Sequence, residues 1–183
     1  GGRLILGAGV GSLKEEFDLL GLGGAEFTER GARGDDALRA LRASLGQRQP
    51  EYHGTYYDFA GLIVDPCAIQ QDMPLWIGGR SARSLRRAVE LGDGWMPFGL
   101  DYADMAGLLA KARELPGWHA RAKPLEIVLR PPGLLDPIGD AEATAGHLRQ
   151  VFAVGGTKAD LHIQSMSSAH FVEQLEALAA MQL

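Results

Sequence analysis

Apolar and polar positions alternate along the chain in a pattern that predicts short buried strands, each followed by a helix. Short apolar runs that end at glycine or another turn residue are typical of buried strands, whereas apolar residues spaced three or four apart are typical of helices. The predicted strands cover residues 3–9, 75–79, 94–97, 125–130 and 160–164. The predicted helices cover residues 13–20, 35–45, 81–91, 102–115, 140–154 and 169–181.

Five strand-then-helix units in strict alternation predict a parallel α/β sheet with right-handed crossovers, either doubly wound or closed as a βα barrel. The acidic pair Asp35-Asp36 suits a helix N-terminus, and Phe171, Leu175 and Leu178 share one face of the last predicted helix. Residues 52–64 depart from the alternation, because they are rich in Tyr and Phe and interrupted by glycine. We expect them to form a strand pair or extended excursion inserted before the next strand. No repeat or linker divides the chain, so one domain is predicted.

Composition narrows the class of protein without changing this architecture. The chain has 183 residues, of which 25 are glycine and 46% are hydrophobic, as in a globular rather than a disordered protein. The 18 Lys and Arg residues against 23 Asp and Glu residues give a net charge of −5, which argues against nucleic acid as a partner. No apolar run approaches the length of about 18 residues that a membrane span needs, so a cytoplasmic protein with no membrane partner is expected. The single cysteine, Cys67, is expected to be a partly buried apolar side chain, and no metal site is predicted.

The first cluster of glycines, Gly7-Ala8-Gly9-Val10-Gly11-Ser12, follows a predicted strand. Both parallel architectures place their ligands at the C-terminal ends of strands. A dinucleotide fingerprint would need a third glycine where Ser12 stands, and no strand with a terminal acid follows at the usual interval. Glycines that only allow a tight turn remain the alternative to a ligand-binding loop.

The second cluster, Gly78-Gly79-Arg80-Ser81, joins a predicted strand directly to a predicted helix. Unpaired backbone N–H groups, the positive end of the helix dipole, the Ser81 hydroxyl and the Arg80 guanidinium together predict an anion site, most naturally for phosphate. Glycine lets a ligand approach the backbone closely. A capping role for Ser81 and a solvated Arg80 stay open as the alternative.

Further candidates lie outside the two clusters. Arg83, Arg86 and Arg87 are expected to form the solvent face of their helix, although one of them could reach a phosphate. Trp95 and Phe98 lie near the end of a predicted strand and could line a pocket for a flat ring, although packing in the core is the preferred interpretation.

Three polar residues lie in the later predicted strands. Arg130 ends a predicted strand and could meet an anion or form a surface ion pair, and Glu126 in the same strand needs a partner if it faces inward. His162 could point into a barrel, but a hydrogen-bonded structural histidine is the preferred interpretation.

Taken together, these segments resemble the luciferase-like monooxygenase superfamily, and within it the branch that uses the deazaflavin coenzyme F420. The resemblance covers nearly the whole chain. It is carried by residues 2–11, Glu29-Arg30-Gly31, His53-Gly54 with Tyr57, Pro74-Leu75-Trp76-Ile77-Gly78-Gly79-Arg80-Ser81, and Leu91-Gly92-Asp93-Gly94-Trp95 with Pro97.

The resemblance implies a partial TIM (β/α)₈ barrel in which this chain supplies strands 4 to 8, with residues 52–64 as the inserted segment. A complete barrel is typically about 250 residues long, so residues 1–183 are predicted to be an N-terminally incomplete domain. The resemblance also implies a cofactor at the C-terminal rim. Its implied binding residues are Gly9, Val10, Gly11, Gly78, Gly79, Arg80 and Ser81. Luciferase proper carries an arginine at the position of Val10, so the apolar residue favours F420 over FMN.

The implied function is flavin- or deazaflavin-dependent oxidoreduction of a small organic substrate, by hydride transfer or monooxygenation. The cofactor carries out the difficult step and the protein orients it, and no catalytic acid or base is identified. A non-catalytic barrel subunit or remnant, and a flavin-independent phosphate-binding barrel enzyme such as an isomerase or aldolase, are the alternatives. A homodimer or a complementing barrel fragment is the expected protein partner.

Overall fold

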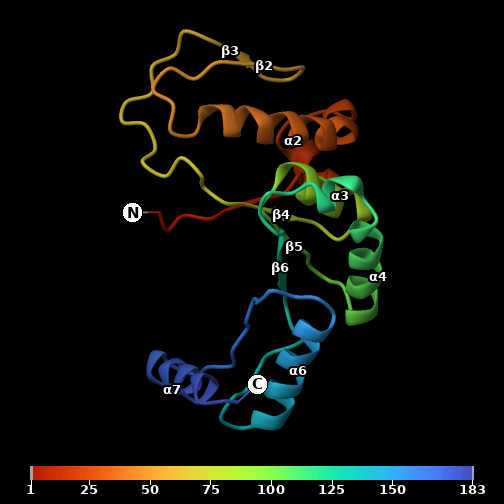
Figure 1. Ribbon diagram of the computed structural model, residues 1–183, viewed down its shortest axis with the longest axis vertical. Helices are drawn as coiled ribbons and strands as arrows, with labels where there is room; N and C mark the ends of the chain where they lie inside the picture. The colour runs from red at the N-terminus through yellow and green to blue at the C-terminus, as the bar shows by residue number, and fades with distance from the viewer. Residues whose placement is uncertain (1, 183) are drawn as a thin grey trace.

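The computed structural model describes residues 2–182 and contains an open parallel sheet flanked by helices (Figure 1). Its strands, in hydrogen-bonded order, are β1 (Leu6–Ala8), β4 (Leu75–Gly78), β5 (Gly94–Met96), β6 (Glu126–Leu129) and β7 (Lys158–Ala159). Every neighbouring pair is parallel. The strand order follows the chain order, which confirms the predicted α/β fold of about five βα units and is consistent with part of a barrel wall.

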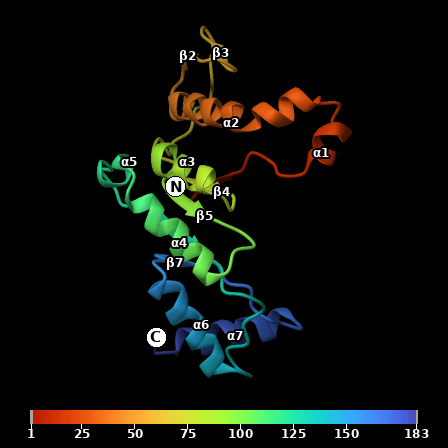
Figure 2. The same ribbon diagram turned by 90° about the vertical axis from the view of Figure 1, so that its right-hand side faces the viewer.

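Helices connect the strands, and a small hairpin is inserted before β4. The helices are α1 (Lys14–Leu19), α2 (Gly24–Ser44), α3 (Ala82–Leu91), α4 (Tyr102–Arg113), α5 (Pro116–His119), α6 (Ala141–Ala153) and α7 (Ser168–Ala179). The hairpin pairs β2 (Tyr52–His53) with β3 (Asp58–Phe59) in antiparallel register, as the sequence predicts for residues 52–64. It lies on the side of α2 that is away from the sheet (Figures 1 and 2).

The two faces of the sheet are chemically different. Ile77, Trp95 and Ile127 are cross-strand neighbours, and all three are buried in the core that the sheet shares with α3 and α4. The adjacent row consists of Trp76, Gly94 and Glu126, which are also cross-strand neighbours. Because successive side chains of a strand point to opposite faces, this second row lies on the face that a closed barrel would turn inward.

The helix expected to begin at Asp35 is longer than predicted. It begins at Gly24, after the extended residue Gly23, and continues through Gly31 and Gly34 as one helix of 21 residues. Glycine is a poor helix former, so these two residues conceal the helical pattern in the sequence. Asp35 is therefore no first-turn residue, and its carboxylate pairs with a side chain of α3 instead.

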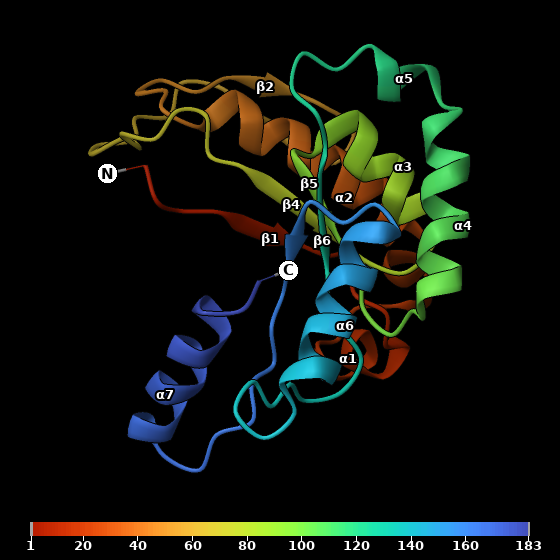
Figure 3. The ribbon, with the colours of Figure 1, turned by 60° about the horizontal axis from the view of Figure 1, so that its bottom comes forward.

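The C-terminal segment also differs from the prediction. The strand expected at residues 160–164 is wrong: β7 comprises Lys158–Ala159, and beyond it a single parallel bridge joins Leu135 to Ile163. Helix α7 forms where predicted, but it lies apart from α3 and α4, with Phe171 and Leu175 each 40% exposed (Figure 3). The apolar face read from the sequence is thus not packed into the core of the described residues.

Candidate functional site

A cavity of about 620 Å³ opens at the carboxyl ends of β1 and β4, between their loops and α2. It is lined by all seven residues that the resemblance implies for a cofactor: Gly9, Val10, Gly11, Gly78, Gly79, Arg80 and Ser81. The two glycine clusters are about 70 positions apart in sequence, and the parallel pairing of β1 with β4 brings them together. Their role in binding a cofactor stays a prediction.

Gly9 points to a ligand more directly than its neighbours do. Gly11 has a φ of +76°, and a Cβ there would lie 2.8 Å from a ring carbon of Phe17, so its conformation and packing both favour glycine. Gly9 has neither constraint: its φ is not positive, and a Cβ would meet no atom within 4 Å. A side chain at Gly9 would only enter open space, which is the condition for close approach of a ligand to the backbone.

The loop after β4 ends in a capping box on α3. The Ser81 hydroxyl accepts a hydrogen bond from the Ser84 N–H at 3.2 Å, while the Ser84 hydroxyl accepts from the Ser81 N–H at 3.1 Å and donates to the Ser81 carbonyl at 2.8 Å. The capping role that the sequence left open for Ser81 is therefore real. The hydroxyl still has its own proton to donate, because a serine hydroxyl both donates and accepts. In the first turn the N–H groups of Ala82 and Arg83 lie beyond the reach of intrahelical acceptors.

Gly79 and Trp95 hold this loop in place. Gly79 has a φ of +117°, and a Cβ there would lie 2.8 Å from Cβ of Ser84. The Trp95 side chain is fully buried, and its Nε1–H donates to the Gly79 carbonyl at 3.1 Å. Of the two uses considered for Trp95, the structure shows core packing, with the indole nitrogen supporting the cavity wall.

Four arginines line the cavity, and none of its described lining residues is Asp or Glu. Arg80 and Arg83 extend from the N-terminal end of α3 and are exposed. Arg30, on α2, donates from Nε to the Gly11 carbonyl at 3.0 Å. Three cations without an acidic neighbour in the lining, together with a helix N-terminus, make the cavity suitable for an anion.

The fourth arginine, Arg87, was expected on the solvent face of its helix, and that expectation is wrong. Arg87 does not belong to the solvent face of α3, because its side chain is only 5% exposed. Its Nε pairs with the Asp35 carboxylate, and a terminal nitrogen donates to the Gly31 carbonyl at 3.1 Å. Asp35 neutralises Arg87, so this residue fastens α3 to α2 and shapes the cavity.

Val10 supplies an apolar patch in the same cavity. It packs against α2, where a Cβ on Gly34 would lie 2.5 Å from its Cγ1 atom. Arg30 and Gly31 have no role that the sequence predicted, although both belong to the Glu29-Arg30-Gly31 stretch that carries the resemblance. That stretch was the available signal, but the length of α2 concealed where its residues would lie.

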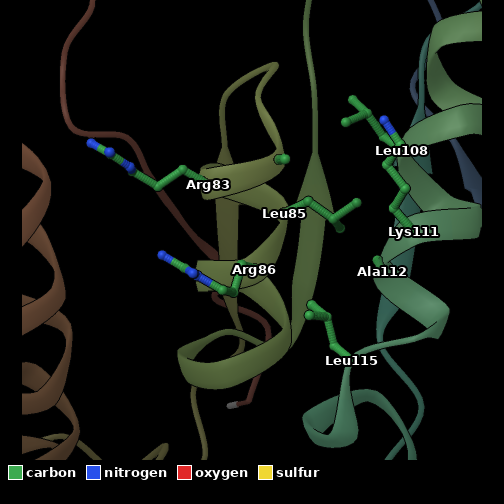
Figure 4. A pocket seen from close by; sticks show the side chains of 8 residues that line it. Arg83, Leu85, Arg86, Leu108, Lys111, Ala112 and Leu115 are labelled. Atoms are coloured by element: carbon green, nitrogen blue, oxygen red, sulfur yellow. The ribbon is translucent and has the colours of Figure 1, made fainter.

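A second cavity, of about 280 Å³, lies between α3 and α4 and has a different character. Leu85 of α3 faces Leu108 and Leu115, whereas Arg83 and Arg86 extend away from α4 (Figure 4). Its walls are therefore mostly apolar, and polar groups do not converge on it as they do in a ligand site. It contains none of the loop glycines.

The remaining candidates have structural partners. Nε of Arg130 donates to Asp160 at 2.7 Å, which is the ion pair that the sequence allowed. Glu126 accepts from Nε1 of Trp76 at 2.7 Å and pairs with Lys158 at 3.1 Å. The His162 side chain is exposed, contrary to the preferred interpretation of a structural histidine. Among residues 2–182, the hydrogen bond made by His162 is through its backbone carbonyl, which accepts from the Leu135 N–H at 2.8 Å.

Over residues 2–182, no cluster of three or more His, Cys, Asp or Glu side chains is arranged to hold a metal ion. Within the same residues, none of the helices combines the length and apolar character needed to cross a membrane. Cys67 is half-buried, as expected.

Comparison with known proteins assigns the family. The sequence profile of the luciferase-like monooxygenases matches residues 1–180, which is nearly the whole chain. The chain belongs to the luciferase-like monooxygenase family. A curated relative, the FMNH2-dependent dimethylsulfone monooxygenase of Pseudomonas putida, is 31% identical over 86 residues. That match covers 47% of this chain and 24% of that enzyme, so the chain spans only part of its relative.

Solved structures of other enzymes have a similar fold. A monooxygenase from Streptomyces bottropensis matches with a TM-score of 0.70 and 19% identity, over 97% of this chain and 67% of that one. The coenzyme F420-dependent tetrahydromethanopterin reductase of Methanopyrus kandleri matches with a TM-score of 0.60 and 15% identity, over 87% of this chain and 68% of that one. The partial-barrel fold expected from the sequence is confirmed, and at these identities the likeness extends to the fold alone.

Proposed function

We propose that the cavity at the ends of β1 and β4 binds the deazaflavin coenzyme F420, and that the protein transfers hydride between this cofactor and a small organic substrate. The observation that carries the proposal is the acid-free cavity at the strand ends, with three cationic side chains and the N-terminus of α3 on its wall. Cofactor phosphates bind at such helix termini. The family supplies the reaction class, oxidoreduction.

The residues of the cavity fit the two ends of such a cofactor. Arg80, the Ser81 hydroxyl and the first-turn N–H groups of α3 would hold the phosphate. Gly9, whose missing side chain leaves open space, would let the ring approach β1. When bound, the deazaflavin supplies hydride transfer, and the protein orients it and excludes water from it.

Val10 supports F420 over FMN. An arginine at this position meets the flavin phosphate in luciferase proper, whereas Val10 packs its methyl groups against Gly34 of α2. FMN stays the alternative cofactor, since one relative is named for FMNH2 and another for F420. Both relatives support a flavin or deazaflavin as the cofactor.

Cofactor binding can be measured by titrating the purified chain with F420 and with FMN and following the fluorescence. We expect F420 to bind more tightly than FMN. Arg80→Ala should weaken F420 binding at least about tenfold, because a charge-assisted hydrogen bond contributes roughly 1.5–3 kcal/mol. Arg86→Ala is the matched control, because Arg86 is also exposed on α3 but lines the other cavity. Equal binding by the wild type and Arg80→Ala would remove the phosphate assignment.

A second variant separates binding from folding. Ser81→Ala removes the cap of α3 and should cost about 1 kcal/mol of stability, so weaker binding by this variant is ambiguous. Ser81→Asp keeps a capping oxygen but sets a negative charge beside the phosphate. We expect this variant to keep the wild-type melting temperature to within a few degrees and to lose F420 binding. If neither cofactor binds but inorganic phosphate does, a flavin-independent phosphate-binding enzyme replaces this proposal.

A further inference from the structure

A third cavity, of about 470 Å³, lies at the carboxyl ends of β5 and β6. The loop after β5 forms one side of it, the loop after β6 forms another, and His162 closes it from the segment after β7. Its volume is within the range of about 300–1,000 Å³ that is typical of small-molecule sites. None of the residues assigned to the cofactor lines it.

The side chain of Phe98 forms a ridge that separates this cavity from the proposed cofactor site. Phe98 is 52% exposed and lines both cavities. The Arg80 guanidinium lies 5.7 Å from the centre of the Phe98 ring. The next residue, Gly99, has a φ of +61°, and a Cβ on it would lie 3.7 Å from Arg80. A molecule in the third cavity would therefore lie next to one in the first, across a single aromatic ring.

The walls of the third cavity are mainly apolar. They include Pro97, Leu100, Met105, Pro131, Pro132 and Leu134. Apolar walls with few polar groups select ligands by shape and by one or two hydrogen bonds.

Two polar side chains reach the cavity, Arg130 and His162. The carboxylate of Asp160 accepts from Nε and from one terminal nitrogen of Arg130. The ion pair cancels the charge of Arg130 but leaves its other terminal nitrogen as a hydrogen-bond donor. The polar part of the cavity therefore suits an acceptor that carries no charge of its own.

We infer that the third cavity is the substrate site, and that it takes a small, neutral, largely apolar molecule with one strong hydrogen-bond acceptor, such as a sulfonyl or carbonyl oxygen. This inference rests on the proposed function for its meaning as a substrate site. Phe98 is then the residue that sets the distance between substrate and cofactor, and Arg130 orients the acceptor. Two observations carry the inference. Asp160 neutralises Arg130 at the end of an apolar cavity, and this cavity shares the Phe98 wall with the proposed cofactor site.

The test uses two probes of nearly the same shape, methyl phenyl sulfone and benzenesulfonate, with the purified chain and without cofactor. Calorimetry or ligand-observed NMR gives the two affinities. We expect the neutral sulfone to bind at least about fivefold more tightly than the anion, because transfer of an unpaired charge into an apolar site is unfavourable. Equal or tighter binding of benzenesulfonate would overturn the inference.

The variant Leu134→Glu tests whether the sulfone binds in the third cavity, because Leu134 lines that cavity. The Leu134 side chain is 64% exposed, so the variant should fold. It should weaken sulfone binding at least about fivefold by placing a charge in the apolar wall. Leu175→Glu is the matched control on α7, outside this cavity, and should bind as the wild type does. An unchanged affinity in Leu134→Glu would show that the sulfone binds elsewhere and would refute the site.

The two proposals fail separately. Arg80→Ala should lose F420 affinity and keep sulfone affinity, and saturating F420 should leave the sulfone bound, because the cavities share only a wall. If Leu134→Glu weakens sulfone binding and the wild type does not bind F420, the F420 proposal is refuted and the third cavity remains a small-molecule site. Displacement of the sulfone by F420 would show that the third cavity belongs to the cofactor, and so would overturn the inference.

Discussion

Asp36 attaches the inserted hairpin to α2 through one carboxylate. Its oxygens accept from the Tyr52 hydroxyl at 2.5 Å, from the Tyr56 N–H at 2.7 Å and from the Tyr57 N–H at 3.1 Å. These donors, the Tyr52 hydroxyl first, hold the pKa of Asp36 below its ordinary value of 3.8. The same hydrogen bond raises the pKa of Tyr52 above its ordinary value of 10.0. The ionised form of Asp36 is therefore the form that the fold prefers.

At the residue scale we predict that Asp36→Asn lowers the melting temperature at pH 7, because an amide presents one acceptor to three donors. A carboxyl group whose pKa falls on folding stabilises the folded state above its unfolded pKa, near 3.8, and loses that contribution as the pH falls through the lower, folded value. The difference between wild type and variant should thus shrink below about pH 4. Thermal melts from pH 7 to pH 3 measure it.

Asp18→Asn is the control for that experiment. Asp18 forms an exposed pair with Lys14 within α1, and such pairs contribute little. Its melting temperature should follow the wild type at every pH. A difference between wild type and Asp36→Asn that stays constant down to pH 3 would contradict the ionised role of Asp36.

At the scale of elements, the row of the sheet that consists of Trp76, Gly94 and Glu126 depends on glycine, which has no side chain, in its middle position. The Trp76 indole crosses from β4 to Glu126 on β6, and the strand between them contributes Gly94. A Cβ on Gly94 would lie 2.5 Å from Cδ1 of Trp76. Glu126 continues the row to Lys158 on β7, so one polar chain joins three of the five strands. Glu126 was expected to need a partner if it faced inward, and it has two, Trp76 and Lys158.

We predict that Gly94→Ala destabilises the fold by about 1–3 kcal/mol, since the indole must move from its hydrogen bond to make room for the methyl group. Chemical unfolding followed by Trp fluorescence measures the change. Gly107→Ala in the middle of α4 is the matched control, because its Cβ would meet no atom within 4 Å. That variant should be as stable as the wild type or more stable by up to about 1 kcal/mol. Unchanged stability in Gly94→Ala would show that the indole has room elsewhere.

At the scale of the whole molecule, the structure is a packed centre with a loosely attached C-terminal helix. Strands β4, β5 and β6 share one core with α3 and α4. Helix α7 has a single fully buried side chain, Gln174. Its amide accepts from the Ile138 N–H at 3.0 Å and donates to Asp136 at 2.7 Å. The Gln174 amide also keeps the pKa of Asp136 below its ordinary value.

Hydrogen exchange should reproduce this division, with slow exchange in β4, β5 and β6 and fast exchange in α7. We predict that Gln174→Ala speeds exchange in α7 further and leaves the central strands unchanged, because it removes the hydrogen bonds that join Gln174 to Asp136 and to the Ile138 N–H. Gln150→Ala, at an exposed site on α6, is the control. Faster exchange across the whole sheet in Gln174→Ala would mean that α7 belongs to the central folding unit. The expected homodimer or complementing fragment stays a prediction.

The sequence by itself determined the alternation of strands and helices of a parallel α/β fold, the insertion at residues 52–64 and the two glycine loops, and it allowed the cap at Ser81. These features depend on local properties: apolar periodicity, glycine at turns and a serine before a helix. These features can be predicted from the sequence because each of the properties involves only a few neighbouring residues.

Only the tertiary structure decided the start of α2 at Gly24, the burial of Arg87, the exposure of His162 and the loose packing of α7. The same holds for the meeting of the two glycine loops and for the ridge at Phe98 between two cavities. Each of these depends on a partner that is distant in sequence, as Asp35 is 52 positions from Arg87. A local pattern records what a residue favours, whereas packing between distant segments determines which contacts it makes.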